Sequence, residues 1–238
     1  MCGRFALAVK PEILKSHFSL SGALELAPSW NIAPSLNIAT ITGESDGSRQ
    51  LNMRRWGLIP SWAKDAAVGN KLNNARGETV AEKPSFKSAL KYRRCLIPAS
   101  GFYEWHTENG IKQPWYISLK SGEPMAFAGL WETWQPAGGE AVESCCIITT
   151  AANAIMEPIH ERMPVILQPA QWEGWLSQQE QKAAHLLPLL CPHDASSMQA
   201  WPVSRELNRI GARNDAGLTE PVSATDVVAP VLQSSLPF

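Results

Sequence analysis

The chain has 238 residues, of which 45% are hydrophobic and 18% are charged, and its formal net charge is −1. This composition is typical of a globular protein with one sizeable domain or two small ones. It excludes a helical membrane span, because no apolar run reaches the roughly 18 residues that one requires. We also expect no secretory segment, and the near-zero net charge by itself argues against a nucleic-acid partner.

The N-terminal part predicts one strand and one helix before the first loop. Residues 2–7 are apolar enough for a buried strand, and Pro11 is placed to open a helix. The residues expected on the inner face of this helix are Ile13, Leu14 and Phe18. We expect a loop over 30–34, because Asn and Pro both interrupt regular structure.

The middle of the chain predicts a hairpin, a loop and a short helix. Strands are expected over 35–42 and 50–59, joined by a turn at 43–47 that holds two glycines. Residues 59–64 are expected to form a loop that carries an exposed Trp62. The helix that follows is expected to run from about Pro84 to Lys91. Its lysines at i, i+4 spacing are Lys83, Lys87 and Lys91.

The C-terminal part is rich in predicted strands. These are expected over 93–98, 101–106, 113–119, 125–131, 143–150, 164–168 and 198–204. A loop over 158–164 precedes the sixth of them, and Pro169 opens a helix whose inner face carries Trp172, Trp175 and Leu176. Beyond Gly211 the residues show no clear periodicity, so 211–238 are expected to be a mostly unstructured tail.

Many short strands with a few helices indicate one α+β domain over residues 2–210. We expect curved antiparallel sheets or an open barrel, with the helices at its flanks. The charge is unevenly distributed in this domain. Residues 49–94, called here the basic stretch, hold 11 Lys or Arg against 3 Asp or Glu, a local +8, so the rest of the chain is −9. The pattern indicates one basic face, and the alternative is a chance cluster of solvated side chains.

The cysteine and histidine spacing indicates no disulfide framework and no zinc site. The five cysteines are odd in number and contain no C-x-x-C pair: Cys2, Cys95, Cys145, Cys146 and Cys191. No two histidines have an H-x-x-x-H spacing. We therefore expect a reducing cytoplasm, no metal and no other cofactor.

The first four residues, Met1-Cys2-Gly3-Arg4, favour reaction with an aldehyde. A small residue follows Met1, so an aminopeptidase is expected to remove Met1 and leave a free amine on Cys2. An α-amine and a thiol on adjacent carbons react with an aldehyde in two steps, first to an imine and then to a five-membered thiazolidine. Gly3 permits close backbone approach, and Arg4 places a fixed charge nearby. The alternative is an ordinary cysteine on a frayed terminus.

Three other stretches carry candidate site residues. Asn74 and Arg76 share one face of an extended segment and suit a phosphate or a sugar oxygen, unless they are a turn-forming Asn and a solvated Arg. Glu104 stands in the aromatic run 101–105, where lost hydration is expected to raise its pKa into the range of a general acid or base. The alternative is a strand-edge Glu paired with a Lys. His160 is a candidate proton carrier or a structural loop residue.

A weaker signal lies at 201–205, where Ser204 and Arg205 are candidates for a further phosphate contact. The high count of ten tryptophans is mostly expected to fill the core, with some as stacking platforms for bases.

Five motifs occur in order and together resemble the SRAP family, the SOS response-associated peptidases or abasic-site processing proteins. They are Cys-Gly-Arg at 2–4, Asn-x-x-Pro at 31–34, Asn-x-Arg-x-Glu at 74–78, Gly-Phe-Tyr-Glu-Trp at 101–105 and His-x-Arg-Met-Pro at 160–164. Each motif is weak alone, but five in order are specific. The resemblance covers about residues 2–210.

The resemblance implies a β-rich fold with a positively charged cleft for single-stranded DNA. It implies a reversible thiazolidine crosslink between Cys2 and the ring-opened aldehyde of an abasic site, within the DNA damage (SOS) response. The crosslinking is a lyase-like activity. The family's name also records a peptidase activity, and self-removal of Met1 would account for that name. We expect a monomer, associated with the nucleoid when bound to DNA.

The resemblance also implies roles for individual residues. Asn74 would hold the sugar, Glu104 would move protons, and His160 would assist ring opening and reversal. The implied DNA contacts are Arg4, Arg76, Arg162, Ser204 and Arg205 at phosphates, and Pro34 and Trp62 as a wedge and a stacking surface.

Two other functions compete with this interpretation. An N-terminal-nucleophile hydrolase, such as a glutamine amidotransferase or a peptidase, would use the Cys2 thiolate on an amide carbonyl and would not depend on DNA. A non-covalent module for single-stranded nucleic acid would bind equally well without the Cys2 thiol.

Overall fold

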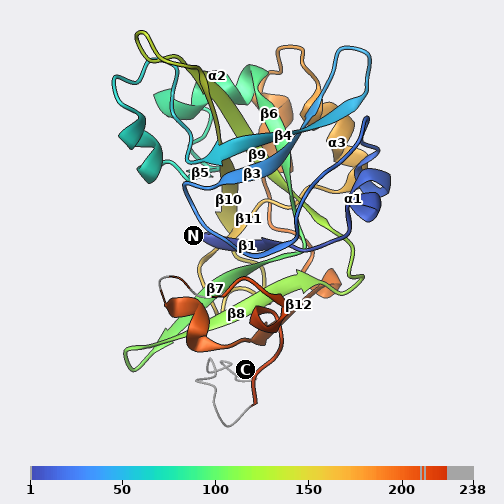
Figure 1. Ribbon diagram of the computed structural model, residues 1–238, viewed down its shortest axis with the longest axis vertical. Helices are drawn as coiled ribbons and strands as arrows, with labels where there is room; N and C mark the ends of the chain where they lie inside the picture. Colours follow the sequence, from blue (N-terminus) through green and yellow to red (C-terminus); the bar gives the residue numbers. More distant parts are fainter. Residues whose placement is uncertain (1, 210, 212, 224–238) are drawn as a thin grey trace, which may run out of the picture.

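The computed structural model describes residues 2–209, 211 and 213–223. Figure 1 shows a β-barrel in the upper part of the molecule and a second, twisted sheet below it, with the N-terminal end between the two. The β-rich α+β class expected from the sequence is confirmed. The remaining question is how this arrangement positions the first residues of the chain.

Five strands close the barrel, because the last strand of the ring pairs with the first. In ring order they are β10 (Val142–Ala151), β4 (Arg49–Trp56), β3 (Asn37–Gly43), β6 (Arg94–Ala99) and β9 (Met125–Trp134). Two short strands, β11 (Arg162–Pro164) and β5 (Asn74–Arg76), attach to β10 outside this ring. The barrel is therefore closed rather than open, and β10 pairs in parallel with β4 and β5 while the other pairs are antiparallel.

The second sheet is antiparallel throughout and has the N-terminal strand among its members. Its order is β12 (Met198–Pro202), β8 (Ile111–Leu119), β7 (Gly101–Glu108), β1 (Arg4–Leu7) and β2 (Ser29–Ile32). A tight turn at Asn109-Gly110 joins β7 to β8, and both residues have positive φ, as a two-residue hairpin turn of this kind requires. Since β1 pairs on both of its edges, the start of the chain is held within the sheet.

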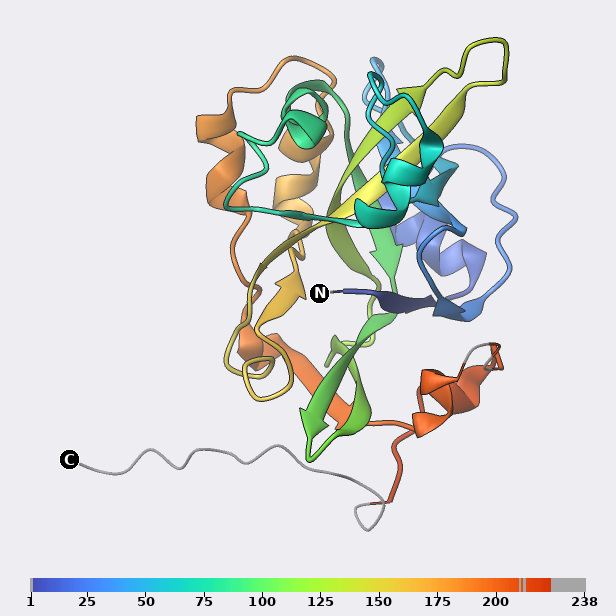
Figure 2. The same cartoon turned by 90° about the vertical axis from the view of Figure 1, so that its left-hand side faces the viewer.

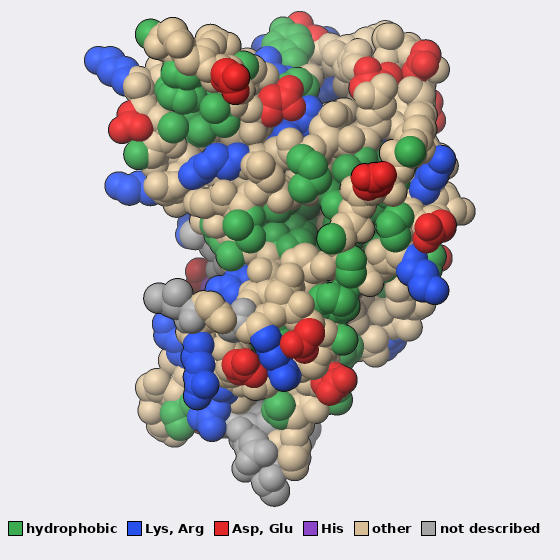
Figure 3. Space-filling model, viewed as in Figure 1, with side chains coloured by type: hydrophobic (Ala, Val, Ile, Leu, Met, Phe, Trp, Pro, Cys, Tyr) green, Lys and Arg blue, Asp and Glu red, His purple; other side chains and the backbone are tan. Residues whose placement is uncertain are grey.

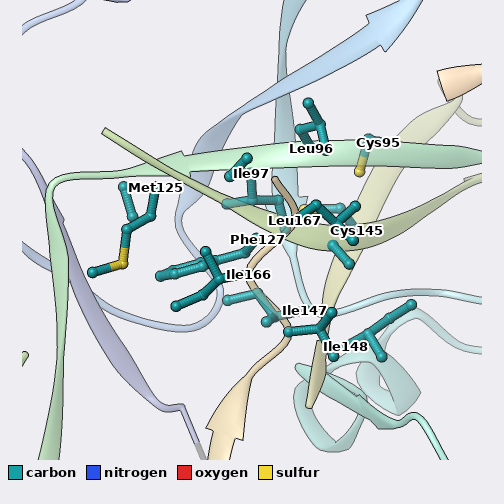
Figure 4. Close-up of a cluster of buried hydrophobic side chains, with 14 of the residues drawn as sticks. Cys95, Leu96, Ile97, Met125, Phe127, Cys145, Ile147, Ile148, Ile166 and Leu167 are labelled. Carbon is teal, nitrogen blue, oxygen red and sulfur yellow. The ribbon is translucent and has the colours of Figure 1, made fainter. Parts of the chain in front are cut away.

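Packed side chains fill the barrel and connect it to the second sheet. Cys95, Gly129 and Ile147 lie opposite one another on three adjacent strands and so share a face. Figure 4 shows the dense packing of this apolar region. At the lower end, the Phe127 ring meets Phe5 of β1 and Phe102 of β7 at centroid distances of 6.1 and 5.9 Å. These edge-on contacts fix the N-terminal strand against the barrel.

Three of the helices begin with proline at their first position, where the missing N–H has no cost. They are α1 (Pro11–Phe18), α2 (Pro84–Tyr92) and α3 (Pro169–Leu176), and they flank the barrel in Figure 1. A short α4 (Ala183–Leu186) and five 3-10 turns complete the described elements: η1 (Ala66–Lys71), η2 (Leu187–Leu189), η3 (Ala195–Ser197), η4 (Arg205–Asn208) and η5 (Ala216–Leu218). The Trp172 ring of α3 stacks on Phe18 of α1 at 4.8 Å.

The expected inner face of α3 is confirmed, but that of α1 is narrower than expected. Trp172, Trp175 and Leu176 are all buried. In α1, Leu14 and Phe18 are buried at i, i+4 spacing, whereas Ile13 is 50% exposed. An eight-residue helix at the edge of the barrel has room for only one buried stripe.

Two local assignments from the sequence were wrong. The segment expected to be a loop at 30–34 begins with strand β2, because its backbone pairs with β1, more than twenty residues earlier in the chain. The strand expected over 164–168 is instead the end of β11, followed by an isolated bridge between Ile166 and Phe127. In both places the partner strand, and not the local pattern, decides the conformation.

Part of the expected unstructured tail is packed onto the domain. Within 213–223, Leu218 is fully buried, and the Trp201 Nε1–H donates to the Thr219 carbonyl at 2.8 Å. An isolated bridge joins Pro221 to Val203. The prediction of a structureless segment therefore does not hold for these residues, while 224–238 lie outside the described part of the chain.

The packing of the barrel predicts opposite effects for two glycine substitutions. A Cβ on Gly129 would lie 2.8 Å from Cys95 Sγ and 2.9 Å from Ile97 Cδ1. Gly129→Ala should therefore lower the free energy of unfolding by about 1–3 kcal/mol. Gly174→Ala is the matched control, because it lies in α3 with nothing within 4 Å of its Cβ position. It should raise stability by about 0.5–1 kcal/mol. Urea denaturation measures both, and equal effects would contradict this packing.

Candidate functional site

Cys2 lies where the second sheet meets the barrel. It directly precedes β1 and is fully buried in a chain that carries Met1 before it. Its carbonyl accepts a hydrogen bond of 2.9 Å from the Asn74 Nδ2 of β5. Asn74 is placed there because β5 pairs with β10 in the register Ile147–Asn74. Strand β5 and the start of β1, which are far apart in the sequence, therefore meet at Cys2.

Glu104 reaches the same place from β7. Gly101, at the start of this strand, is required, because a Cβ there would lie 2.4 Å from the Tyr116 ring. Glu104 is only 2% exposed. Burial raises the pKa of its carboxyl from 4.5 to about 7, against the opposing influence of the chain's positive amino terminus. A carboxyl with this pKa can exchange a proton near neutral pH.

His160 is held in one tautomer by the loop before β11. Its Nδ1 accepts a hydrogen bond of 2.9 Å from the backbone N–H of Arg162. The neutral ring therefore carries its proton on Nε2, which lies 4.0 Å from Glu104 Oε2. Burial lowers the pKa of His160 below its usual value. A neutral imidazole whose N–H faces a carboxyl is arranged to exchange a proton with it.

The Cys2 thiol is kept protonated by the same environment. Burial raises its pKa well above the usual range, and the negative charge of Glu104 raises it further. A backbone N–H of Arg4 opposes this shift but does not overcome it. The group at this position is therefore a neutral thiol beside a proton-exchanging carboxyl, not a resting thiolate.

A cavity of about 470 Å³ opens beside these groups and is lined by Arg4, Glu104, Trp105, Thr107, Lys112, His160, Leu207 and Asn208. Figure 2 shows the N-terminal end between the segment around residues 60–80 above and the β7–β8 hairpin below. In the space-filling view the left edge is hollowed at this level, with Lys and Arg side chains above and below the hollow (Figure 3). The opening suits an extended anionic ligand.

Arg4 projects into this cavity from β1. Its Nη1 donates a hydrogen bond to the Asn31 Oδ1 of β2, and burial lowers its pKa. Asn31 belongs to one of the five motifs, but nothing in the sequence pattern indicates its contact with Arg4. Lys112 and Asn208 are further cavity residues that the sequence did not indicate, because they lie outside the five motifs, in β8 and in the 3-10 turn η4.

Arg162 does not fit the expected contact with DNA phosphate. Its Nη1 and Nη2 form a two-pronged ion pair with Glu78 at 2.6 and 2.9 Å, and Nη2 also donates to the Thr149 carbonyl at 2.8 Å. The side chain is buried. These contacts make it a structural residue that fixes the loop of His160, since its own backbone N–H holds that ring.

Ser204 and Arg205 lie at a different cavity. Ser204 caps η4, since its Oγ accepts the Glu206 N–H at 3.2 Å. Arg205 is exposed and lines a separate cavity of about 630 Å³ together with Gln113 and Arg209. The structure therefore does not bring these two residues into the cavity that holds Glu104.

The basic stretch is not one continuous basic face, because several of its arginines are used inside the fold. Arg54 is buried, pairs with Glu143 at 3.0 Å and stacks on the Trp131 ring at 4.3 Å. Arg93 pairs with Glu132 at 2.8 Å. Arg94 is buried and donates only to backbone carbonyls, among them that of Trp175 at 2.8 Å. The count of +8 therefore overstates the charge available to a ligand.

The remaining predicted contacts stay at the surface. Trp62 is 62% exposed, and its loop is anchored because the Trp134 Nε1–H donates to the Ala63 carbonyl at 2.7 Å. Arg76 is exposed two residues after Asn74, with buried Ala75 between them. Pro34 is half-buried just after β2. Their roles stay predictions.

A family model described as "SOS response associated peptidase (SRAP)" matches residues 1–210. The chain belongs to the SRAP family. It is 45% identical to the abasic site processing protein YoqW of Bacillus subtilis, over 87% of this chain and 94% of that protein. It is 31% identical to the abasic site processing protein HMCES of Xenopus tropicalis, over 87% of this chain and 75% of that one.

Solved structures share the fold of this SRAP chain. A crystal structure of a protein from Bacteroides thetaiotaomicron superposes with a TM-score of 0.83 at 26% identity, covering 93% of this chain and all of that one. A second, from Bordetella bronchiseptica, gives a TM-score of 0.75 at 26% identity, covering 85% of this chain and all of that one.

Two negative findings apply to residues 2–209, 211 and 213–223 of this SRAP protein. No helix among them is long and apolar enough to cross a membrane. Nor do they contain a group of three or more His, Cys, Asp or Glu side chains arranged to hold a metal ion.

The raised pKa of Glu104 predicts a measurable dependence of stability on pH. The folded chain binds this proton more tightly than the unfolded chain, whose value is near 4.5. Stability from this group is therefore greatest below about pH 4.5 and declines as pH rises to about 7. Glu104→Gln should remove this decline, so the variant should gain stability relative to wild type over that window. Denaturation at several pH values checks this, and a constant difference between the two proteins would contradict it.

Proposed function

We propose that this protein captures abasic sites in single-stranded DNA by forming a reversible covalent bond through Cys2 after Met1 is removed. The observation that carries the proposal is the convergence of Cys2, Asn74, Glu104 and His160 beside a cavity that also holds Arg4. Similarity to proteins named for abasic-site processing supports the choice of substrate.

The chemistry follows from the paired amine and thiol. The ring-opened sugar of an abasic site presents an aldehyde at C1′. The Cys2 amine adds to this carbon and, after loss of one water molecule, forms an imine. The thiol sulfur then adds to the imine carbon, its proton is transferred to the nitrogen, and a thiazolidine ring results. The net change is one water lost, and no oxidant or reductant is needed, so addition of water reverses it.

Glu104 and His160 supply the proton transfers that these steps require. Loss of the hydroxyl as water needs an acid, which a carboxyl with a pKa of about 7 can be. Transfer of the thiol proton during ring closure then needs a base, which the same group has become. His160 is 4.0 Å away and can return the proton or open the sugar ring. The Asn74 amide, which donates to the Cys2 carbonyl, would hold a sugar hydroxyl.

The surface residues provide a path for the strand. Arg4 and exposed Arg76 are suited to phosphates, while Trp62 presents an aromatic surface to unpaired bases. Pro34 would act as a wedge. Arg205 and Ser204 belong to the separate cavity and would meet the strand only at a greater distance from Cys2. Stacking requires unpaired bases, which favours single strands over duplex.

The order of the first step separates the proposal from the hydrolase alternative. A hydrolase would attack first through the Cys2 sulfur, whereas capture of an aldehyde begins with the amine. Burial and the charge of Glu104 raise the pKa of the thiol, which favours a first step through nitrogen. We propose peptidase chemistry only for the release of Met1.

A denaturing gel tests the covalent bond. The mature protein, incubated with single-stranded DNA that holds one abasic site, should give a band that survives detergent. Cys2→Ala should give none, because the imine formed by its amine has no thiol to close on it. An extra residue that stays in front of Cys2 should also abolish the band, since the nitrogen is then an amide. A full-rate crosslink from either variant would overturn the mechanism, and binding without any crosslink would favour the non-covalent module.

DNA affinity tests the proposed strand path. Trp62→Ala should weaken binding to undamaged single-stranded DNA by about 1–3 kcal/mol, because a stacked base loses its platform. Tyr92→Ala is a matched control, since Tyr92 is also an exposed aromatic residue (43%) but ends α2 and lines a cavity separate from that of Arg4 and Glu104. It should leave affinity unchanged. Fluorescence anisotropy at two salt concentrations measures both, and equal losses would exclude Trp62 as a stacking surface.

A further inference from the structure

The segment after η4 contacts the outer edge of strand β2. Asn214 Oδ1 accepts a hydrogen bond of 2.7 Å from the backbone N–H of Trp30 and one of 3.3 Å from the Ser29 hydroxyl. In the second sheet β2 is the last strand, with β1 on its inner side. The Asn214 side chain thus satisfies a backbone donor that the edge of a sheet would otherwise leave to solvent.

A second contact continues from this segment to Arg4. The carbonyl of Arg213 accepts a hydrogen bond of 3.1 Å from Asn31 Nδ2. The other end of the same amide, Oδ1, accepts from Arg4 Nη1. A carbonyl accepts and a guanidinium donates, so these two partners fix the orientation of the Asn31 amide. The contacts therefore form a continuous path from residue 213, through Asn31, to the cation in the cavity.

Residues 213–218 are themselves held in place, by hydrogen bonds within the segment and by an ion pair with η4. Asp215 caps η5 by accepting the Gly217 N–H at 2.9 Å. The Arg213 Nε lies 3.4 Å from Glu206 Oε2 of η4. Leu218 is buried in one cluster with Ala6 of β1, Tyr103 of β7 and Leu207 of η4, so the segment is attached to the second sheet and to η4. Residues 213 and 214 are thus held against β2 from outside the part of the chain that the family model matches.

We propose that Arg213 and Asn214 are positioning residues that orient Arg4 for a phosphate of the bound strand. The inference rests on the proposed DNA-binding role of Arg4. A long arginine side chain loses rotamer freedom when it is fixed, and the Asn31 contact incurs this entropic cost before DNA arrives. When Asn214 is lost, the Trp30 N–H loses its partner and the outer edge of β2 is held by fewer contacts, so Asn31 holds the guanidinium less firmly.

The test is a double-mutant cycle between Asn214 and Arg4, read as non-covalent affinity for undamaged single-stranded DNA. Asn214→Ala should weaken binding about 3- to 10-fold in the wild-type background and have no effect in the Arg4→Ala background. Asn214→Asp keeps an acceptor for the Trp30 N–H, so it should recover affinity to within about twofold of wild type at a salt concentration that screens its charge. Thr219→Ala, in the same segment, removes only a hydroxyl that donates to the Ala216 carbonyl within that segment, and it is the control that should leave affinity unchanged.

The outcomes separate the two proposals. If Arg4→Ala binds as well as wild type, the DNA role of Arg4 fails, and with it this part of the proposed function. If Arg4→Ala weakens binding but Asn214→Ala does not, the positioning role is overturned and the proposed function stands. If Asn214→Ala weakens binding equally in both backgrounds, its effect does not pass through Arg4 and the inference is also overturned. Thermal unfolding of each variant identifies any loss of fold, which would reduce affinity in both backgrounds.

Discussion

Pairing of β1 along both of its edges is the constraint on which the candidate site depends. One edge pairs with β7, in the register Arg4–Tyr103, and the other with β2, in the register Phe5–Ile32. The first residues of a chain usually fray, because few contacts hold them. Here they are fixed on both sides and packed against Phe127 of the barrel. A reactive group at the end of the chain can therefore have a defined geometry, which an exposed terminus would not give it.

This placement has an electrostatic consequence for Glu104. The register that places Arg4 opposite Tyr103 also places Glu104 beside the residue that precedes Arg4. Burial of a carboxylate is costly unless the group takes up a proton or finds a cation. Glu104 takes up a proton more readily than an exposed carboxylate does, because burial raises its pKa to about 7. The positive amino terminus opposes this shift. The burial that holds the start of the chain in place therefore also raises the pKa of the Glu104 carboxyl.

The sequence predicted the fold class, the prolines that open the helices and the three residues, Asn74, Glu104 and His160, that lie together near Cys2. These features depend on local patterns and on motifs that can be read from the chain itself. The sequence could not predict that β2 forms where a loop was expected, since this strand exists only by pairing with β1. Nor could the sequence predict that Arg162 forms an ion pair with Glu78, because the two residues are 84 positions apart in the chain. A count of charges along the sequence does not distinguish a buried arginine from one available to a ligand.

The order of the proposed bond-forming steps follows from the two nucleophiles of Cys2. Burial, and after it the charge of Glu104, hold the thiol in its neutral form before the reaction begins, so sulfur is then the poorer of the two nucleophiles. The amine therefore reacts first, and the positive charge of the iminium that it forms favours ionisation of the sulfur beside it. Glu104 has just given up its proton to the departing water and is then a base, able to accept the thiol proton. In this proposal, ring closure is coupled to imine formation through one carboxyl, which acts as the acid in the first step and as the base in the second.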